Sequence, residues 1–253
     1  MKYIIFILLL TIALFGVHGK AEAQLGNTNS PPQANKTITK PLSPPEEFLL
    51  DVFFYGDVLY GDENKSSLNK LDVNAFPEEI RARVAEFKYR YLNFKSMLKE
   101  PEYNSDVQSN FMAEIWFDKK VSFEHTLVSL INTPGIETIA ADIAADTDFY
   151  YEWEGFSEGP LSEGAWARNY LGNNPGTPLE PYMILFVIHR NHYAISALKS
   201  ELNSPPFDDY PTELAKGWLQ ETETSYAHFM QRAAEHPDPL VGWMAKAIAR
   251  LRD

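Results

Sequence analysis

Two histidines, His189 and His192, are the residues whose types and spacing most directly suggest chemistry. They stand three residues apart in the stretch "YMILFVIHRNHYAIS", residues 182–196. On a helix this spacing brings both side chains to one face, where imidazole nitrogens can bind an ion such as zinc. A metal site also needs a third ligand. The candidates, on or beyond a helix predicted over 136–151, are Asp142, Asp146, Glu152 and Glu154.

The same stretch also fits a structural interpretation, which we favour. The helix predicted over 178–201 is apolar on nearly all sides, as expected of a central, buried helix. Buried polar groups without partners cost about 1 to 3 kcal/mol each, so its polar residues should form a hydrogen-bonded cluster. The expected members are His189, Arg190, Asn191 and His192. A buried guanidinium requires an acceptor, so we expect a carboxylate against Arg190. The candidates are again Asp142, Asp146, Glu152 and Glu154.

Other patterns that carry catalytic chemistry are sparse. The chain has no cysteine nucleophile, no His-Glu-x-x-His motif and no glycine-rich phosphate loop. The neighbours Glu124 and His125 lie on a predicted amphipathic helix, where we expect a half-exposed surface pair. The acidic run over 142–158 lacks the spacing of a calcium-binding loop. We therefore expect no cofactor.

The N-terminus has the features of a secretory signal peptide over residues 1–23. Lys2 precedes an apolar run over 3–17, and Ala21-Glu22-Ala23 gives the small-x-small cleavage pattern. The run is shorter than the roughly 20 residues that span a bilayer, so we expect no membrane-spanning segment after cleavage. Residues 24–42 are rich in Asn, Thr, Pro and Gln and are predicted to be a disordered linker. The mature protein is expected in a periplasm or secreted.

Charge and cysteine content narrow the classes of partner. The chain has 35 acidic and 22 basic residues, a formal net charge of −13. Such acidity argues against nucleic acid, whose binding needs clustered Lys and Arg, and against anionic membrane surfaces. Without cysteine there are no disulfides, so the exported chain must be stabilised by its core. Residues 43–253 are long enough to form a single globular domain with such a core.

Every strong periodic signal in residues 43–253 is helical. Ser43-Pro44-Pro45-Glu46 has the form of a capping box with proline in the first turn. The clearest apolar stripe consists of Ile80, Val84, Phe87, Tyr91, Phe94 and Leu98. Further helices are predicted over 107–118, 121–132, 136–151, 161–171, 178–201, 211–235 and 239–252. No segment alternates as a strand would, so we predict an all-α, single-domain multi-helix bundle or short α-solenoid-like stack of helix pairs.

The segment 150–198 carries a resemblance. It is similar to a helix-pair unit found in exported bacterial helical proteins of uncharacterised function. Its loop "NNPGTPLEP" resembles the inter-repeat turns of tetratricopeptide-like proteins, in which Pro and a small residue stop one helix and start the next. The resemblance implies a pair of packed helices and brings no activity.

Two functions from different classes fit the sequence. The first, which we favour, is a non-enzymatic exported protein that binds a protein or peptide in a groove between helices. The alternative is a metal-assisted hydrolase centred on His189 and His192, with Asp142 or Asp146 completing the site.

Overall fold

The computed structural model describes residues 41–55, 67–102, 107–147, 156–203 and 212–251, with the side chains of residues 107–112 left aside. By its internal contacts the chain divides after Ile38, and residues 39–253 make up one unit. The predicted signal peptide, residues 1–23, and the predicted linker up to residue 40 lie outside the described residues. Leu42, at the end of that predicted linker, belongs to the core and is only 8% exposed.

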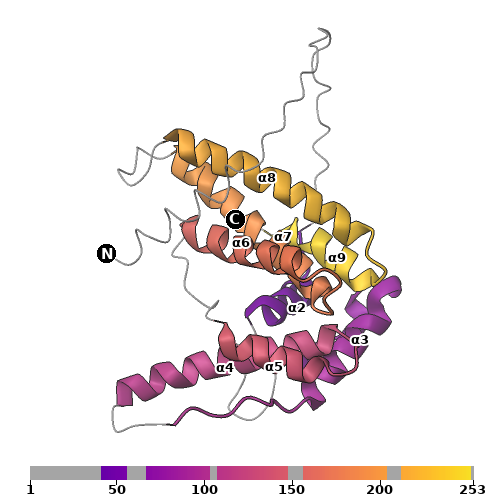
Figure 1. The fold of residues 1–253 in the computed structure, drawn as a ribbon. Coiled ribbons are helices and arrows are strands. Elements are labelled where there is room, and N and C mark those ends of the chain that lie inside the picture. The colour runs from indigo at the N-terminus through magenta and orange to yellow at the C-terminus, as the bar shows by residue number, and fades with distance from the viewer. Residues whose placement is uncertain (1–40, 56–66, 103–106, 148–155, 204–211, 252–253) are drawn as a thin grey trace. The chain divides into compact units, whose positions relative to one another are not determined.

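The described residues form eight α-helices and two short 3-10 helices, with no strand among them (Figure 1). This confirms the all-α prediction. The α-helices are α2 (Pro44–Tyr55), α3 (Glu78–Asn93), α4 (Val107–Leu130), α5 (Ile136–Asp146), α6 (Glu158–Asn173), α7 (Glu180–Asn203), α8 (Thr212–Ala234) and α9 (Pro239–Ile248). The 3-10 helices are Ser67–Lys70 and Val73–Ala75. None of the described helices is long and apolar enough to cross a membrane.

The start of α2 forms as its sequence predicts. The Glu46 carboxylate accepts hydrogen bonds from the Ser43 backbone N–H at 2.8 Å and from its hydroxyl at 3.0 Å. The first of these, from the N-cap N–H to the carboxylate three residues on, is one half of a capping box. Arg250, just beyond α9, donates to the other Glu46 oxygen at 3.0 Å, so the two ends of the described unit are tied together.

Several predicted helix boundaries were wrong, and three of them show why. The stripe ending at Leu98 leaves the helix after Asn93, because the chain becomes extended at Phe94. The predictions over 107–118 and 121–132 are one continuous helix, α4, since Lys119 and Lys120 between them are good helix formers. Helix α5 ends at Asp146 rather than 151, and Lys120 donates to the Ala145 carbonyl in its last turn at 2.6 Å.

Helix α7 occupies the centre of the described unit. It packs against α6 and α8 most extensively, and also against α9 and α4. All ten residues from Tyr182 to Asn191 are buried, whereas the second half of the helix is partly exposed. A helix that is apolar on all sides must be covered on all sides, and the neighbouring helices provide that cover.

Candidate functional site around helix α7

His189 lies in the interior, held by an aromatic and a polar neighbour from helix α2. Its ring stacks on Phe54 with the centroids 3.9 Å apart. Its Nε2 lies 3.4 Å from the Tyr55 hydroxyl, and its Nδ1 lies 2.7 Å from Nη1 of Arg190. A guanidinium only donates hydrogen bonds, so Nδ1 must be the acceptor and the proton sits on Nε2, which donates to Tyr55. His189 is therefore neutral.

The electrostatics around His189 agree with this assignment. Burial, then the charges of Arg190 and His192, hold the pKa of His189 well below its ordinary value. Burial also raises the pKa of Tyr55, with Tyr193 close beside it. Neither group is poised to exchange a proton near neutral pH, so the pair is arranged for hydrogen bonding rather than for acid–base chemistry.

The carboxylate that pairs with Arg190 is Glu163 of α6, which the sequence analysis did not propose. The Nε of Arg190 donates to Glu163 at 2.5 Å, and both side chains are almost fully buried. The guanidinium also lies over the Phe186 ring, 4.0 Å from its centroid. A carboxylate therefore lies against the buried arginine as expected, and Glu163 was not among the four candidates.

Four carboxylates were proposed as partners of Arg190 or as metal ligands. Two of them, Asp142 and Asp146, lie among the described residues. Asp142 and Asp146 are exposed on α5, so neither is the carboxylate that lies against the buried Arg190. Glu152 and Glu154 lie outside the described residues. No group of three or more potential metal ligands is brought together within the described part of the chain.

Asn191 completes the buried part of the cluster. Like His189 and Arg190 it is 1% exposed. Its amide nitrogen donates to the Ser225 hydroxyl of α8 at 2.9 Å, and its amide oxygen accepts from Arg168 of α6 at 3.2 Å. Asn191 thus joins three helices through one side chain.

His192 diverges from His189 and faces a groove between α7 and α8. The groove has a volume of about 290 Å³. Its lining residues are His192, Ile195, Ser196, Lys199, Glu223 and Tyr226. Lys199 and Glu223 form an exposed ion pair across the two helices at 2.8 Å. The HxxH spacing therefore places one histidine in the interior and the other in a surface groove.

The pair Glu124 and His125 is not the half-exposed surface feature that we predicted. Glu124 is fully buried, and its carboxylate accepts hydrogen bonds from the Ser96 hydroxyl and from the Met97 backbone N–H. The His125 ring lies edge-on to Phe94, and burial lowers its pKa. The extended segment after α3 covers α4 here, and this tertiary contact cannot be seen in the helical periodicity alone.

One further pattern was missed in the sequence. Residues 155–159, Gly-Phe-Ser-Glu-Gly, match the Gly-x-Ser-x-Gly pattern of serine hydrolases. That pattern has catalytic meaning at a sharp turn from strand to helix, whereas Ser157 stands at the start of α6 in a unit whose described residues contain no strand. Ser157 is buried, and its N–H and hydroxyl donate to Glu201 of α7, each at 2.8 Å. It anchors α6 and is not accessible as a nucleophile.

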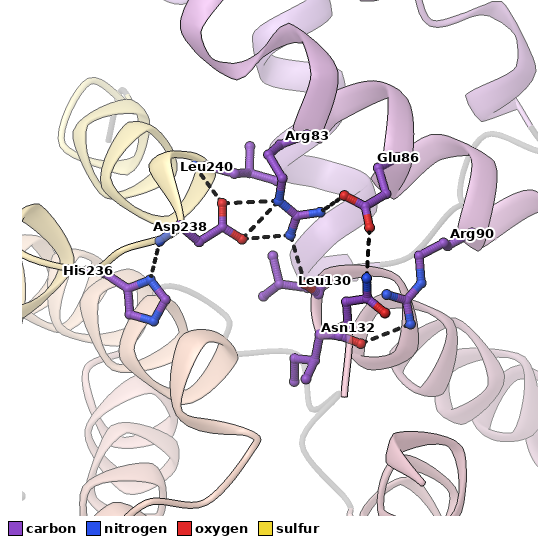
Figure 2. Close-up of polar contacts among 9 residues, drawn as sticks. Arg83, Glu86, Arg90, Leu130, Asn132, His236, Asp238 and Leu240 are labelled. Carbon is purple, nitrogen blue, oxygen red and sulfur yellow. Dashed lines mark hydrogen bonds and ion pairs between the residues drawn. The ribbon is translucent and has the colours of Figure 1, made fainter. Parts of the chain in front are cut away.

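A second polar cluster lies away from α7, where α3 meets the start of α9 (Figure 2). Arg83 donates from Nε and Nη2 to the Asp238 carboxylate, the shortest contact being 2.6 Å. It also donates to Glu86 at 2.5 Å and to the Leu130 carbonyl at 2.9 Å. Asp238 is in addition the N-cap of α9, since it accepts from the Leu240 N–H. All three nitrogens of Arg83 donate within this cluster and both Asp238 oxygens accept, so we assign the Arg83–Asp238 pair a structural role.

No protein-family model, curated protein or solved structure matches the chain. Any function proposed for it therefore rests on its own residues and their geometry.

Proposed function

We propose that the chain is an exported, non-enzymatic binding protein that holds a short peptide segment of a partner in the groove between α7 and α8. The observation that carries this proposal is the groove itself, which is lined by one face of α7 and two residues of α8. Its volume of about 290 Å³ is at the lower limit of small-molecule sites. It therefore suits one or two peptide side chains better than a whole cofactor.

The lining indicates which peptide would fit. Ile195 and Tyr226 offer apolar and aromatic surface, and Lys199 and Glu223 offer one charge of each sign. Interfaces commonly combine an apolar centre with a polar rim. We expect a peptide with one aromatic or aliphatic anchor flanked by charged residues, whose side chains replace the exposed ion pair.

The interior cluster supports a binding role over the metal-assisted hydrolase. The Nδ1 of His189 already accepts from the Arg190 guanidinium, so a cation bound there would face a fixed positive charge. The other ring nitrogen faces Tyr55. His192 lines the groove, but its Nε2 is buried, so it too is not presented as an open metal ligand.

Peptide selection on the folded protein tests the binding role. A random peptide display library is panned against the wild-type chain and against Ser196→Arg, which fills the groove without removing a core side chain. The control is Ala82→Arg, the same addition on an exposed position of α3. Peptides should be enriched on the wild type and on Ala82→Arg and lost on Ser196→Arg. Equal enrichment on all three would contradict the proposal.

Metal analysis tests the alternative. The chain is purified without chelator and its metal content is measured by elemental analysis for the wild type, His189→Ala and His192→Ala. A stoichiometric ion that either variant loses would favour the hydrolase. We expect no stoichiometric ion in any of the three.

Export is proposed on the sequence of residues 1–23, with its positive start, apolar run and Ala21-Glu22-Ala23 pattern. The full chain is produced with this segment in a bacterial host, and the intact mass of the protein outside the cytoplasm is measured. The mass should correspond to a chain that begins at Gln24. Retention of residues 1–23 on the exported protein would contradict the predicted cleavage.

A further inference from the structure

Arg168 on α6 differs from every other described arginine in its partner. Four described arginines, Arg83, Arg190, Arg232 and Arg250, each pair with a carboxylate. Arg81 and Arg90 donate to backbone carbonyls. Arg168 donates to one neutral side-chain oxygen, Oδ1 of Asn191, at 3.2 Å, and forms no ion pair among the described residues.

The partner of Arg168 is itself fixed in place. Asn191 is buried on α7, and its amide nitrogen donates to the Ser225 hydroxyl at 2.9 Å. Because a guanidinium only donates, the amide oxygen must be the end that faces Arg168, and the amide nitrogen faces Ser225. Since Ser225 accepts here, its own O–H remains a donor. Arg168 and Ser225 thus approach the two ends of one amide group, from α6 and α8, which both pack on α7.

Arg168 is charged, partly removed from water and not neutralised. Its residue is half-buried, and burial lowers its pKa, with the charge of Glu221 acting in the opposite direction. Glu221 is exposed on α8 and influences Arg168 through its charge, without an ion pair to it among the described residues. A guanidinium has five N–H donors, and one of them is used by Asn191. The other four donors make no hydrogen bond within the described part of the chain.

We propose that Arg168, with Ser225 beside it, binds a carboxylate group above Asn191. The planar fork of a guanidinium matches the two oxygens of a carboxylate in a bidentate pair. The nearby negative charge of Glu221 disfavours a doubly charged anion such as phosphate more strongly than a singly charged carboxylate. This site is independent of the α7–α8 groove, whose lining includes neither Arg168 nor Ser225.

The test follows the Arg168 side chain directly by NMR of the full folded chain. Acetate is titrated at constant ionic strength while the Nε–H resonance of Arg168, assigned by its loss in Arg168→Lys, is recorded. We expect a saturable shift of this resonance. Arg168→Lys keeps the charge and loses the planar fork, so its affinity for acetate should be about tenfold lower. Because this variant lacks the Arg168 resonance, its affinity is measured from the resonance of another residue near the site. Inorganic phosphate should bind more weakly than acetate, and Glu221→Gln should narrow that difference.

The outcomes separate the proposed site from an internal ion pair. If acetate leaves the Arg168 resonance unchanged while Glu221→Gln shifts it, Arg168 pairs with Glu221 in solution and the proposal is wrong. The proposal is also wrong if Arg168→Lys binds acetate with the same affinity as the wild type. If acetate binds, a short peptide with a free C-terminus and its amidated form show whether the site also accepts the carboxylate of a chain end.

Discussion

Arg190 and Arg83 both pair with carboxylates, but at different depths and between different parts of the chain. The Arg190 and Glu163 side chains are 2% and 8% exposed, whereas those of Arg83 and Asp238 are 20% and 18% exposed. Arg190 joins neighbouring helices α7 and α6. Arg83 joins α3 to the start of α9 and to the last carbonyl of α4, segments far apart in sequence (Figure 2).

The difference shows two uses of the same chemical pair. Around Arg190 the protein must satisfy charges that a buried helix has taken out of water, and a buried pair of this kind need not stabilise the fold relative to an apolar alternative. Around Arg83 the charges keep some contact with solvent and hold α3 to the end of α4 and the start of α9. Removing one partner of the Arg190–Glu163 pair should therefore destabilise the fold strongly. The Arg83–Asp238 pair should add a smaller stabilisation.

The largest expected effect follows from breaking the buried pair on one side. Glu163→Ala should lower the free energy of unfolding by about 3 to 5 kcal/mol, because it leaves the Arg190 charge buried without its anion. Arg190→Ala should cost somewhat less, since an unpaired Glu163 can take up a proton. Urea unfolding followed by circular dichroism measures both.

A double substitution sharpens the same comparison. Replacing Glu163 with Leu and Arg190 with Met together removes both charges and keeps similar volume. We expect this protein to be within about 1 kcal/mol of the wild type, as found for apolar replacements of other buried pairs. A loss as large as that of Glu163→Ala would mean that the pair itself stabilises the fold.

The Arg83 cluster should respond less strongly. Asp238→Ala removes the ion pair and the N-cap of α9 together, and should cost about 2 kcal/mol. Asp238→Asn is the matched control, because asparagine still caps the helix and loses only the charge. If Asn and Ala cost the same, the ion pair rather than the cap is what Asp238 contributes.

The sequence was sufficient for the fold class because helical periodicity and caps are local. The 3.6-residue pattern of α3 and the cap at Ser43 appear where they were predicted. Prediction from the sequence failed where contacts with a distant segment determine the local structure. Phe94 and Leu98 continue the helical spacing, yet they pack in an extended segment that Glu124 of α4 holds by hydrogen bonds.

The candidate site shows the same limit. That His189 and Arg190 would be buried followed from an apolar helix around them, but the partner of Arg190 did not. Glu163 lies in a short, weakly amphipathic stretch between glycines, and nothing in its local sequence separates it from the exposed acids nearby. Which carboxylate faces Arg190 depends on how α6 packs on α7, and a single sequence does not give that register.

The pH dependence of stability tests the cluster around His189 and Arg190. The folded-state pKa of His189 lies well below its ordinary value near 6.5 because of burial. Below about pH 6.5 the unfolded chain therefore binds a proton that the folded chain does not, so stability falls as pH falls. The contribution is about 1 kcal/mol between pH 6.5 and 5.5.

His189→Gln tests this assignment, because glutamine keeps an acceptor for Arg190 and does not titrate. Urea unfolding at pH 7 and at pH 5.5 should show a smaller loss of stability in this variant than in the wild type. His125, whose pKa burial also lowers, accounts for part of the remaining slope. An unchanged slope in His189→Gln would mean that His189 is not the group responsible.

The smallest effect is expected at the α7–α8 groove, whose ion pair belongs to neither cluster. Lys199 and Glu223 are 54% and 49% exposed, so solvent screens their attraction. Glu223→Gln should change the free energy of unfolding by less than about 0.5 kcal/mol, and raising the salt concentration should remove that change. Such a weak pair can be exchanged for the charges of a bound peptide at little cost, as the proposed binding role requires. A loss above about 1 kcal/mol would show instead that the pair holds α7 against α8, and that the groove does not open to a peptide in the proposed way.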